Sequence, residues 1–237
     1  MNELTKEGWT IIRTNQTESQ LQSLRDSVFT EQGPGQRCLL DHPVVKQTAI
    51  ALRSELIKAG FLPEGAVAIQ AIAFDKTPAT NWKVTWHQDL MFPFARPVTT
   101  PGFDLPSVKD GVNYARPPRT VLEELLAVRL HLDDCDETNG PLRVAPSSHH
   151  NGILKSTEIH RAVEHHGETP CLAKTGETLL MRPLLLHASS PATTPKHRRV
   201  LHFVYHSGVT IEETWVSVAP GAPDFPSELA RGCGPNW

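Results

Sequence analysis

Between residues 66 and 206 the chain is a series of short apolar segments of strand length, separated by clusters of turn-forming residues. Such segments are typical of β-strands joined by long returns. The predicted strands are 66–74, 83–89, 127–133, 141–145, 178–187 and 199–206. A chain of this size with 20 prolines is seldom a helical bundle. We therefore expect a mainly β fold, an antiparallel sandwich or jelly roll.

Two amphipathic helices are predicted ahead of these strands. Thr17 and Gln20 have the spacing of a capping box, and Pro43 is a favoured first-turn residue of the second helix. We expect both helices to pack on one face of the sheet. The whole chain, 1–237, is interpreted as a single domain, with a helical N-terminal part at about 17–60 and a jelly-roll core at about 66–206.

The composition argues against several classes of protein. Lys and Arg number 23 against 26 for Asp and Glu, whereas a phosphate-binding groove needs a basic excess. No apolar run is long enough to span a membrane, and residues 1–15 lack the apolar core of a secretory signal. The four scattered cysteines favour reduced thiols. We expect a cytoplasmic protein with a small-molecule substrate and no nucleic-acid or membrane partner; the oligomeric state stays open.

The most informative segment is Trp86-His87-Gln88-Asp89. On a strand, positions i and i+2 point to the same face, so His87 and Asp89 are placed to bind one ion together. The pattern alone is weak in a chain with 12 histidines. A second pair of the same form, His131 and Asp133, lies further along the chain.

A third candidate ligand, His187, ends an apolar run, and Arg198 follows it by eleven residues. Two histidines and one carboxylate form the facial triad of non-haem Fe(II) oxygenases, which leaves coordination positions open. A 2-oxo acid and dioxygen would fill those positions. An arginine at the far end of the acid would hold its remote carboxylate through a charge-assisted pair.

These residues, together with the segment 139–149 (NGPLRVAPSSH), resemble the phytanoyl-CoA dioxygenase family. The resemblance covers about residues 66–206 and implies a double-stranded β-helix that uses Fe(II), 2-oxoglutarate and O2. It also implies metal ligation by His87, Asp89 and His187, because the ligand pair of the family precedes this segment by several dozen residues. His131 and Asp133 stand immediately before it instead.

The resemblance also implies roles in co-substrate binding. Ser189, two residues after the distal histidine, would help to hold 2-oxoglutarate. Arg198 matches the family offset for the co-substrate carboxylate, and Arg199 is the alternative because the two point to opposite faces of a strand. Gln70 interrupts an apolar run, so it either touches co-substrate or substrate or points outward.

Three further residues are candidates for contact with substrate. Arg129, on a predicted core strand, either faces the cavity and meets an anion or pairs with a carboxylate such as Glu123. Trp86 and Phe92 flank the ligand pair, although Trp86 has a packing role as its alternative. Lys76 is interpreted as a solvated turn lysine.

Residues 91–118 carry six prolines and two glycines and show no hydrophobic period. Such a stretch inside a compact domain is usually functional, and we expect a lid over the metal. The alternative is a static loop packed against the N-terminal helices.

The predicted activity is hydroxylation, or another oxidation, of a small organic metabolite, with release of succinate and CO2. Asp89 argues against halogenation, because the halogenating relatives lack this carboxylate. A CoA thioester would need basic groups for its phosphates, and the only basic cluster, Lys196 to Arg199, is already partly committed to the co-substrate, so the family name is not carried over as the substrate. The alternatives are a non-catalytic metal-binding jelly-roll protein and a zinc hydrolase using the same ligands.

Overall fold

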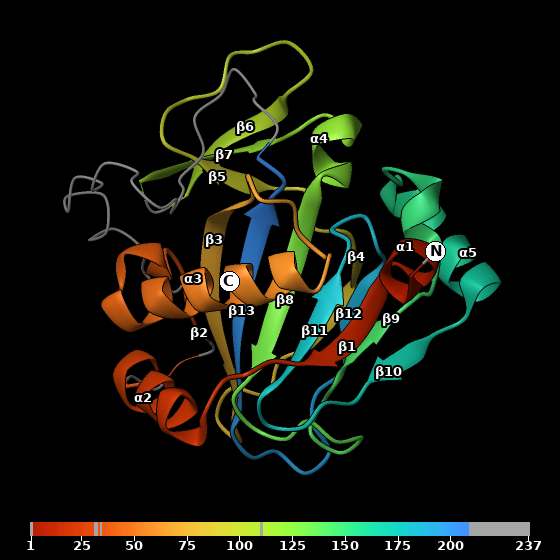
Figure 1. The fold of residues 1–237 in the computed structure, drawn as a ribbon. Coiled ribbons are helices and arrows are strands. Elements are labelled where there is room, and N and C mark those ends of the chain that lie inside the picture. Colours follow the sequence, from red (N-terminus) through yellow and green to blue (C-terminus); the bar gives the residue numbers. More distant parts are fainter. Residues whose placement is uncertain (1, 31–32, 34, 110, 209–237) are drawn as a thin grey trace.

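The computed structural model describes residues 2–30, 33, 35–109 and 111–208. Its main framework is two antiparallel sheets that face each other (Figure 1). The larger sheet has the order β1 (Trp9–Arg13), β11 (Glu177–Met181), β8 (Leu125–His131), β13 (Arg198–His206), β3 (Val67–Lys76), β2 (Gly35–Gln36). The smaller has the order β10 (Thr169–Cys171), β9 (Leu142–Val144), β12 (His187–Ser189), β4 (Val84–His87). This arrangement confirms the mainly β jelly roll.

The predicted helices are confirmed and cover the outer face of the larger sheet (Figure 1). Helix α2 (Glu18–Val28) begins with the predicted capping box of Thr17 and Gln20, and α3 (Pro43–Lys58) has Pro43 in its first turn. The Tyr205 hydroxyl of β13 donates to the Ala49 carbonyl of α3 at 2.8 Å. The apolar stripes of the two helices are therefore buried against β3, β8 and β13.

Shorter elements complete the fold. They are α1 (Glu3–Glu7), α4 (Arg119–Glu123), α5 (Ser156–His166) and the 3-10 turns η1 (Leu39–Asp41) and η2 (Ser148–Asn151). Strand β1, which the sequence did not predict, adds an edge to the larger sheet by pairing with β11. No helix in the described ranges is long and apolar enough to cross a membrane.

The predicted strand 178–187 is wrong as one element, because the chain breaks between β11 and β12, which belong to different sheets. Pro183 lies in the break, where the Leu185 amide donates to the Arg182 carbonyl in a turn. Proline has no N–H to donate to a sheet ladder, so it ends the strand and lets the chain cross to the smaller sheet. This crossing brings His187 into the cavity between the sheets.

Residues 91–118 also differ from expectation, since they form a third sheet with the order β5 (Phe92–Phe94), β7 (Val112–Arg116), β6 (Asp104–Lys109). Phe92, Phe94 and Tyr114 are buried, so the base of this segment is packed scaffold. The prolines stand at its turns and on its short strands. Period-2 alternation is hard to recognise in strands this short.

The cysteines correct one further expectation. Cys135 and Cys171 are buried free thiols, as predicted. Cys38 is disulfide-bonded. Spacing along a sequence does not determine which cysteines a fold brings within bonding distance.

Candidate metal and co-substrate site

A cavity of about 600 Å³ lies between the two sheets, with β5 and β7 at one end. It is lined by residues from both sheets. Among them are eight of the residues predicted to form the site: Gln70, His87, Asp89, Phe92, Arg129, His187, Ser189 and Arg198. A 600 Å³ pocket is the size that binds small organic molecules.

Three candidate ligands meet on one wall of this cavity. His87 ends β4 and His187 begins β12, and the two are direct partners in the strand register. Asp89 follows β4, with its Oδ1 atom 3.8 Å from Nε2 of His87 and 3.6 Å from Nε2 of His187. One ligand atom of each residue lies within 4.8 Å of the others. This separation suits three donors around a single ion.

Both imidazole rings are held so that Nε2 faces the cavity. Nδ1 of His87 lies 2.8 Å from the carbonyl of Thr85, and Nδ1 of His187 lies 2.9 Å from the carbonyl of Leu185. A proton on each Nδ1 leaves the lone pair of Nε2 for a metal. The donor set therefore fits Fe(II), with two imidazoles and one carboxylate on one side of the ion.

The electrostatics of the site keep His187 and Asp89 in the forms that a divalent cation requires. Burial lowers the pKa of His187 to about 4, so its ring is neutral at neutral pH. Burial opposes ionisation of Asp89, but electrostatic interaction with His187, His87, His202 and Arg129 outweighs burial, and the pKa of Asp89 is lowered. Metal ligands must be deprotonated to bind, and His187 and Asp89 meet that condition.

Gln88, between the two ligands, is a site residue that sequence reasoning missed. Its side chain is buried, and its amide donates to the carbonyls of Gly152 and Leu184, both at 2.7 Å. Its Oε1 atom accepts from the Leu154 amide at 2.9 Å. Gln88 follows β4, and its three hydrogen bonds fix the segment that carries His87 and Asp89. A polar residue between two candidate ligands was the available signal.

The second His-x-Asp pair is directed elsewhere. His131 is buried in β8, and both carboxylate oxygens of Asp133 accept from Arg199. The structure brings neither residue into the cluster of His87, Asp89 and His187.

Arg198 and Arg199 point to opposite faces of β13, as the alternation predicts. Arg198 is buried, lines the cavity and donates through Nη1 to the Gly140 carbonyl. Arg199 holds Asp133 through Nε and Nη2, both at 2.8 Å. Of the two, Arg198 is therefore the one that can meet a ligand in the cavity.

The interpretation of Lys76 as a solvated turn residue is wrong. Strand β3 continues to Lys76, which pairs with Arg198 of β13 and is completely buried. Its Nζ atom donates to Oγ of Ser189 at 3.3 Å and to the Ser190 carbonyl at 2.5 Å. Gly140 permits this approach, because a Cβ there would lie 2.8 Å from the same carbonyl.

The residues predicted to contact substrate divide into two groups. Arg129 and Phe92 line the cavity, and Glu123 pairs instead with Arg119. Trp86 lies on the other face of β4, with the Arg143 guanidinium 5.4 Å from its ring centre, and it lines a surface groove beside α5. The strand alternation that turns His87 inward turns Trp86 outward.

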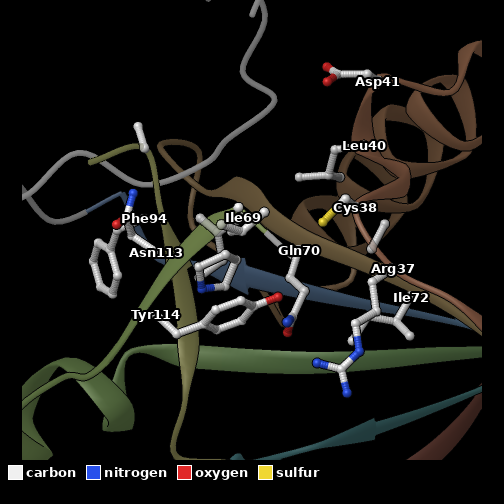
Figure 2. A pocket seen from close by; sticks show the side chains of 15 residues that line it. Arg37, Cys38, Leu40, Asp41, Ile69, Gln70, Ile72, Phe94, Asn113 and Tyr114 are labelled. Atoms are coloured by element: carbon white, nitrogen blue, oxygen red, sulfur yellow. The ribbon is translucent and has the colours of Figure 1, made fainter. Parts of the chain in front are cut away.

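A small pocket of about 50 Å³ adjoins the cavity at the edge of β3 (Figure 2). Gln70, Arg37, Ile72 and Tyr114 line both spaces. Figure 2 shows the Tyr114 side chain of β7 directed toward the Gln70 amide of β3. Gln70 therefore points inward, at the junction of the cavity and this pocket.

Residues 14–200 match the family model described as Phytanoyl-CoA dioxygenase (PhyH). No curated protein sequence matches the chain.

Three similar solved structures show the same fold. HygX from Streptomyces hygroscopicus with iron bound has a TM-score of 0.60 and 15% identity, covering 88% of this chain and 86% of that one. EctD from S. alaskensis with 2-oxoglutarate and 5-hydroxyectoine has a TM-score of 0.63 and 17% identity, covering 99% and 83%. The α-ketoglutarate-dependent carbocyclase SnoK from nogalamycin biosynthesis has a TM-score of 0.60 and 12% identity, covering 87% and 85%.

Proposed function

The chain belongs to the phytanoyl-CoA dioxygenase family of Fe(II)- and 2-oxoglutarate-dependent oxygenases, and on that premise we propose that it hydroxylates, or otherwise oxidises, a small organic metabolite. Succinate and CO2 are the co-products. The observation that carries the proposal is the cluster of His87, Asp89 and His187 at the wall of a cavity of about 600 Å³.

His87, Asp89 and His187 hold the metal in this proposal. Iron held by these three residues would supply the activation of dioxygen, coupled to decarboxylation of 2-oxoglutarate. The chain contributes ligand geometry through the Nδ1 hydrogen bonds of both rings and through the anchoring of Gln88. These contacts fix the three donor groups at one wall of the cavity, beside the space that co-substrate and O2 would enter.

Arg198 and Ser189 hold the distal carboxylate of 2-oxoglutarate. Both are buried cavity residues, and Lys76 positions Ser189 by donating to its hydroxyl oxygen. A carboxylate that enters this low-dielectric position gains a charge-assisted bond to the Arg198 guanidinium. Gln70 contributes a polar group to the wall beside the co-substrate.

The substrate then occupies the part of the cavity nearest Phe92, Tyr114 and Gln70. This end is bounded by β5 and β7, whose buried Phe92 and Tyr114 side chains would limit the access of bulk water to the reacting atoms. HygX and EctD have been solved with hygromycin B and 5-hydroxyectoine respectively, and those ligands belong to those proteins. For this chain the proposed substrate is a small or medium-sized metabolite. The cytoplasm, expected from the sequence, remains the proposed location.

Anaerobic addition of Fe(II) and then 2-oxoglutarate tests the proposal. Chelation by the 2-oxo acid should give a visible charge-transfer band, and Asp89→Ala should abolish it. Screening metabolites for stimulated succinate release should then identify the substrate. Metal-dependent hydrolysis that does not require 2-oxoglutarate would support a zinc hydrolase instead. A charge-transfer band without turnover of any metabolite would support a non-catalytic metal-binding protein.

A further inference from the structure

Arg129 is a buried cation that the proposed function does not use. It lies on β8 and faces the cavity, with 8% of its surface exposed. Its Nη1 atom donates to Nδ1 of His202 on β13 at 3.1 Å. Its Nε atom is buried and has no hydrogen-bond partner within the described ranges. Among the described residues, the hydrogen bond of this guanidinium thus goes to an uncharged imidazole nitrogen, and it forms no salt bridge with a carboxylate.

The charges around Arg129 make this arrangement costly for the protein alone. Burial, followed by the like charge of Arg198, lowers the pKa of Arg129 to about 10, which still leaves it charged at neutral pH. Asp89 is the acidic residue that lines the cavity, and the proposed function commits it to the metal. Two buried arginines therefore face one cavity, and neither forms a salt bridge with a carboxylate in the part of the chain that the structure describes.

The position of Arg129 indicates which anion it takes. Arg129 lines the same cavity as Asp89, His187 and Arg198, and its charge acts on the metal cluster as well as on Arg198 and Lys76. His202 and Arg198 share the inner face of β13, four residues apart. An extended molecule that reaches from the metal to Arg198 would share this cavity with the Arg129 guanidinium.

The guanidinium is also held in place before any ligand binds. Its Cζ atom lies 5.3 Å from the ring centre of Phe74, and the Phe74 and His202 rings meet edge to face at 6.1 Å. His202 lies on β13, which pairs with β8, and Phe74 lies on β3, the next strand beyond β13. A preorganised donor loses little freedom when a carboxylate arrives.

We propose that Arg129, oriented by His202, binds the carboxylate that adjoins the keto group of the 2-oxo acid, while Arg198 binds the distal one. This inference rests on the proposed function and deepens it. The cavity then recognises a 2-oxo dicarboxylate by two separate arginines, one for each carboxylate. Binding neutralises both buried charges together.

Two ligands that each lack one carboxylate distinguish the roles of Arg129 and Arg198. 2-Oxopentanoate has a methyl group in place of the distal carboxylate of 2-oxoglutarate, and 4-oxopentanoate has a methyl group in place of the carboxylate beside the keto group. Binding of each is measured on Ni(II)-substituted protein, directly or by displacement of 2-oxoglutarate, so that turnover plays no part. Arg129→Met should weaken 2-oxoglutarate and 2-oxopentanoate by about tenfold to a hundredfold and leave 4-oxopentanoate unchanged.

Arg198→Met is the matched control and should give the opposite pattern, with 2-oxopentanoate unchanged and 4-oxopentanoate weakened. Arg129→Lys keeps the charge and the fold but loses the two-pronged geometry, so it should weaken 2-oxopentanoate by a smaller factor. Metal content reports on whether each variant keeps an intact site. Equal affinity of the wild type and both Arg129 variants for 2-oxopentanoate overturns the inference. Failure of the wild type to bind 2-oxoglutarate at all would instead overturn the proposed function.

Discussion

His87 and His187 face each other across the pairing of β4 and β12, with their ring centres 4.2 Å apart and the ring planes at 52°. Both rings are anchored at Nδ1 by the carbonyl two residues earlier. The site therefore depends on the register of two short strands, because a slip of one residue would turn one ring out of the cavity.

Alanine at His87, Asp89 or His187 should remove most of the bound iron and all succinate formation, because each change leaves two donors where three are needed. Iron content after anaerobic reconstitution is the measurement. His131→Ala is the control, since His131 lies in β8 away from the cluster. Loss of iron in the control with retention in His87→Ala would show that the wrong pair has been assigned.

Replacement of Arg198 by Met should weaken 2-oxoglutarate binding by about 2–5 kcal/mol, the cost of removing a buried partner of a carboxylate. Arg199→Met should leave binding almost unchanged and instead lower the free energy of unfolding by about 1 kcal/mol, since Arg199 holds the partly exposed Asp133. Titration calorimetry and urea unfolding separate the two effects. The reverse order in the titration would reassign the co-substrate to Arg199.

Gln88→Glu should destabilise the protein and reduce its iron affinity. The substitution keeps the size of the side chain but replaces the amide donor by an acceptor that faces the Gly152 and Leu184 carbonyls. The lost hydrogen bonds and the buried charge should cost about 2–4 kcal/mol of unfolding free energy. Thermal unfolding of the apo-protein tests this, with the exposed Glu158→Gln as a comparison. Wild-type stability and iron content in Gln88→Glu would contradict the anchoring role.

Lys76 should make stability depend on pH. Burial, then the charge of Arg198, lowers its pKa to about 7 in the folded protein, whereas the unfolded chain keeps the proton up to the ordinary value of 10.5. The unfolded state therefore binds more protons between these values, and the free energy of unfolding rises with pH there by at most about 1.4 kcal/mol per unit. Below about pH 7 both states are protonated, and this contribution no longer changes.

Lys76→Met should remove that dependence, so wild-type stability relative to the variant should increase from about pH 7 to about pH 9. Chemical denaturation at a series of pH values measures the difference. Lys174→Met, at a largely exposed lysine, is the matched control. A constant difference between wild type and Lys76→Met over this range would mean that Lys76 is charged in the folded protein throughout.

Hydrogen exchange should divide the segment 91–118 into scaffold and lid. Amides of β5 and β7 should exchange slowly in the free protein, because Phe92, Phe94 and Tyr114 are buried. Amides from Arg96 to Lys109 should exchange quickly and become slower when co-substrate and substrate are bound, since much of β6 is exposed. Slow exchange of this part in the free protein, unchanged by ligands, would make the whole segment scaffold.

Local sequence patterns predicted much of the framework. The capping box at Thr17 and the first-turn Pro43 marked the starts of α2 and α3, because helix ends have unpaired backbone groups that specific residues satisfy nearby in the chain. The opposite orientation of the Arg198 and Arg199 side chains followed from the period of two along a strand. The His-x-Asp pattern, the distal histidine and the motif 139–149 nominated the metal ligands.

Contacts between strands that are distant in the sequence were decided by the tertiary structure alone. Lys76 could be recognised as buried only once β3 was paired with β13, and the Arg129–His202 contact exists only because β8 pairs with that same strand. Alternation separates the two faces of β4, but packing in three dimensions determines that Trp86 faces the groove beside α5. A strand's hydrogen-bond partners and cavity neighbours come from other parts of the chain, and short-range sequence patterns carry no information about which strands will meet.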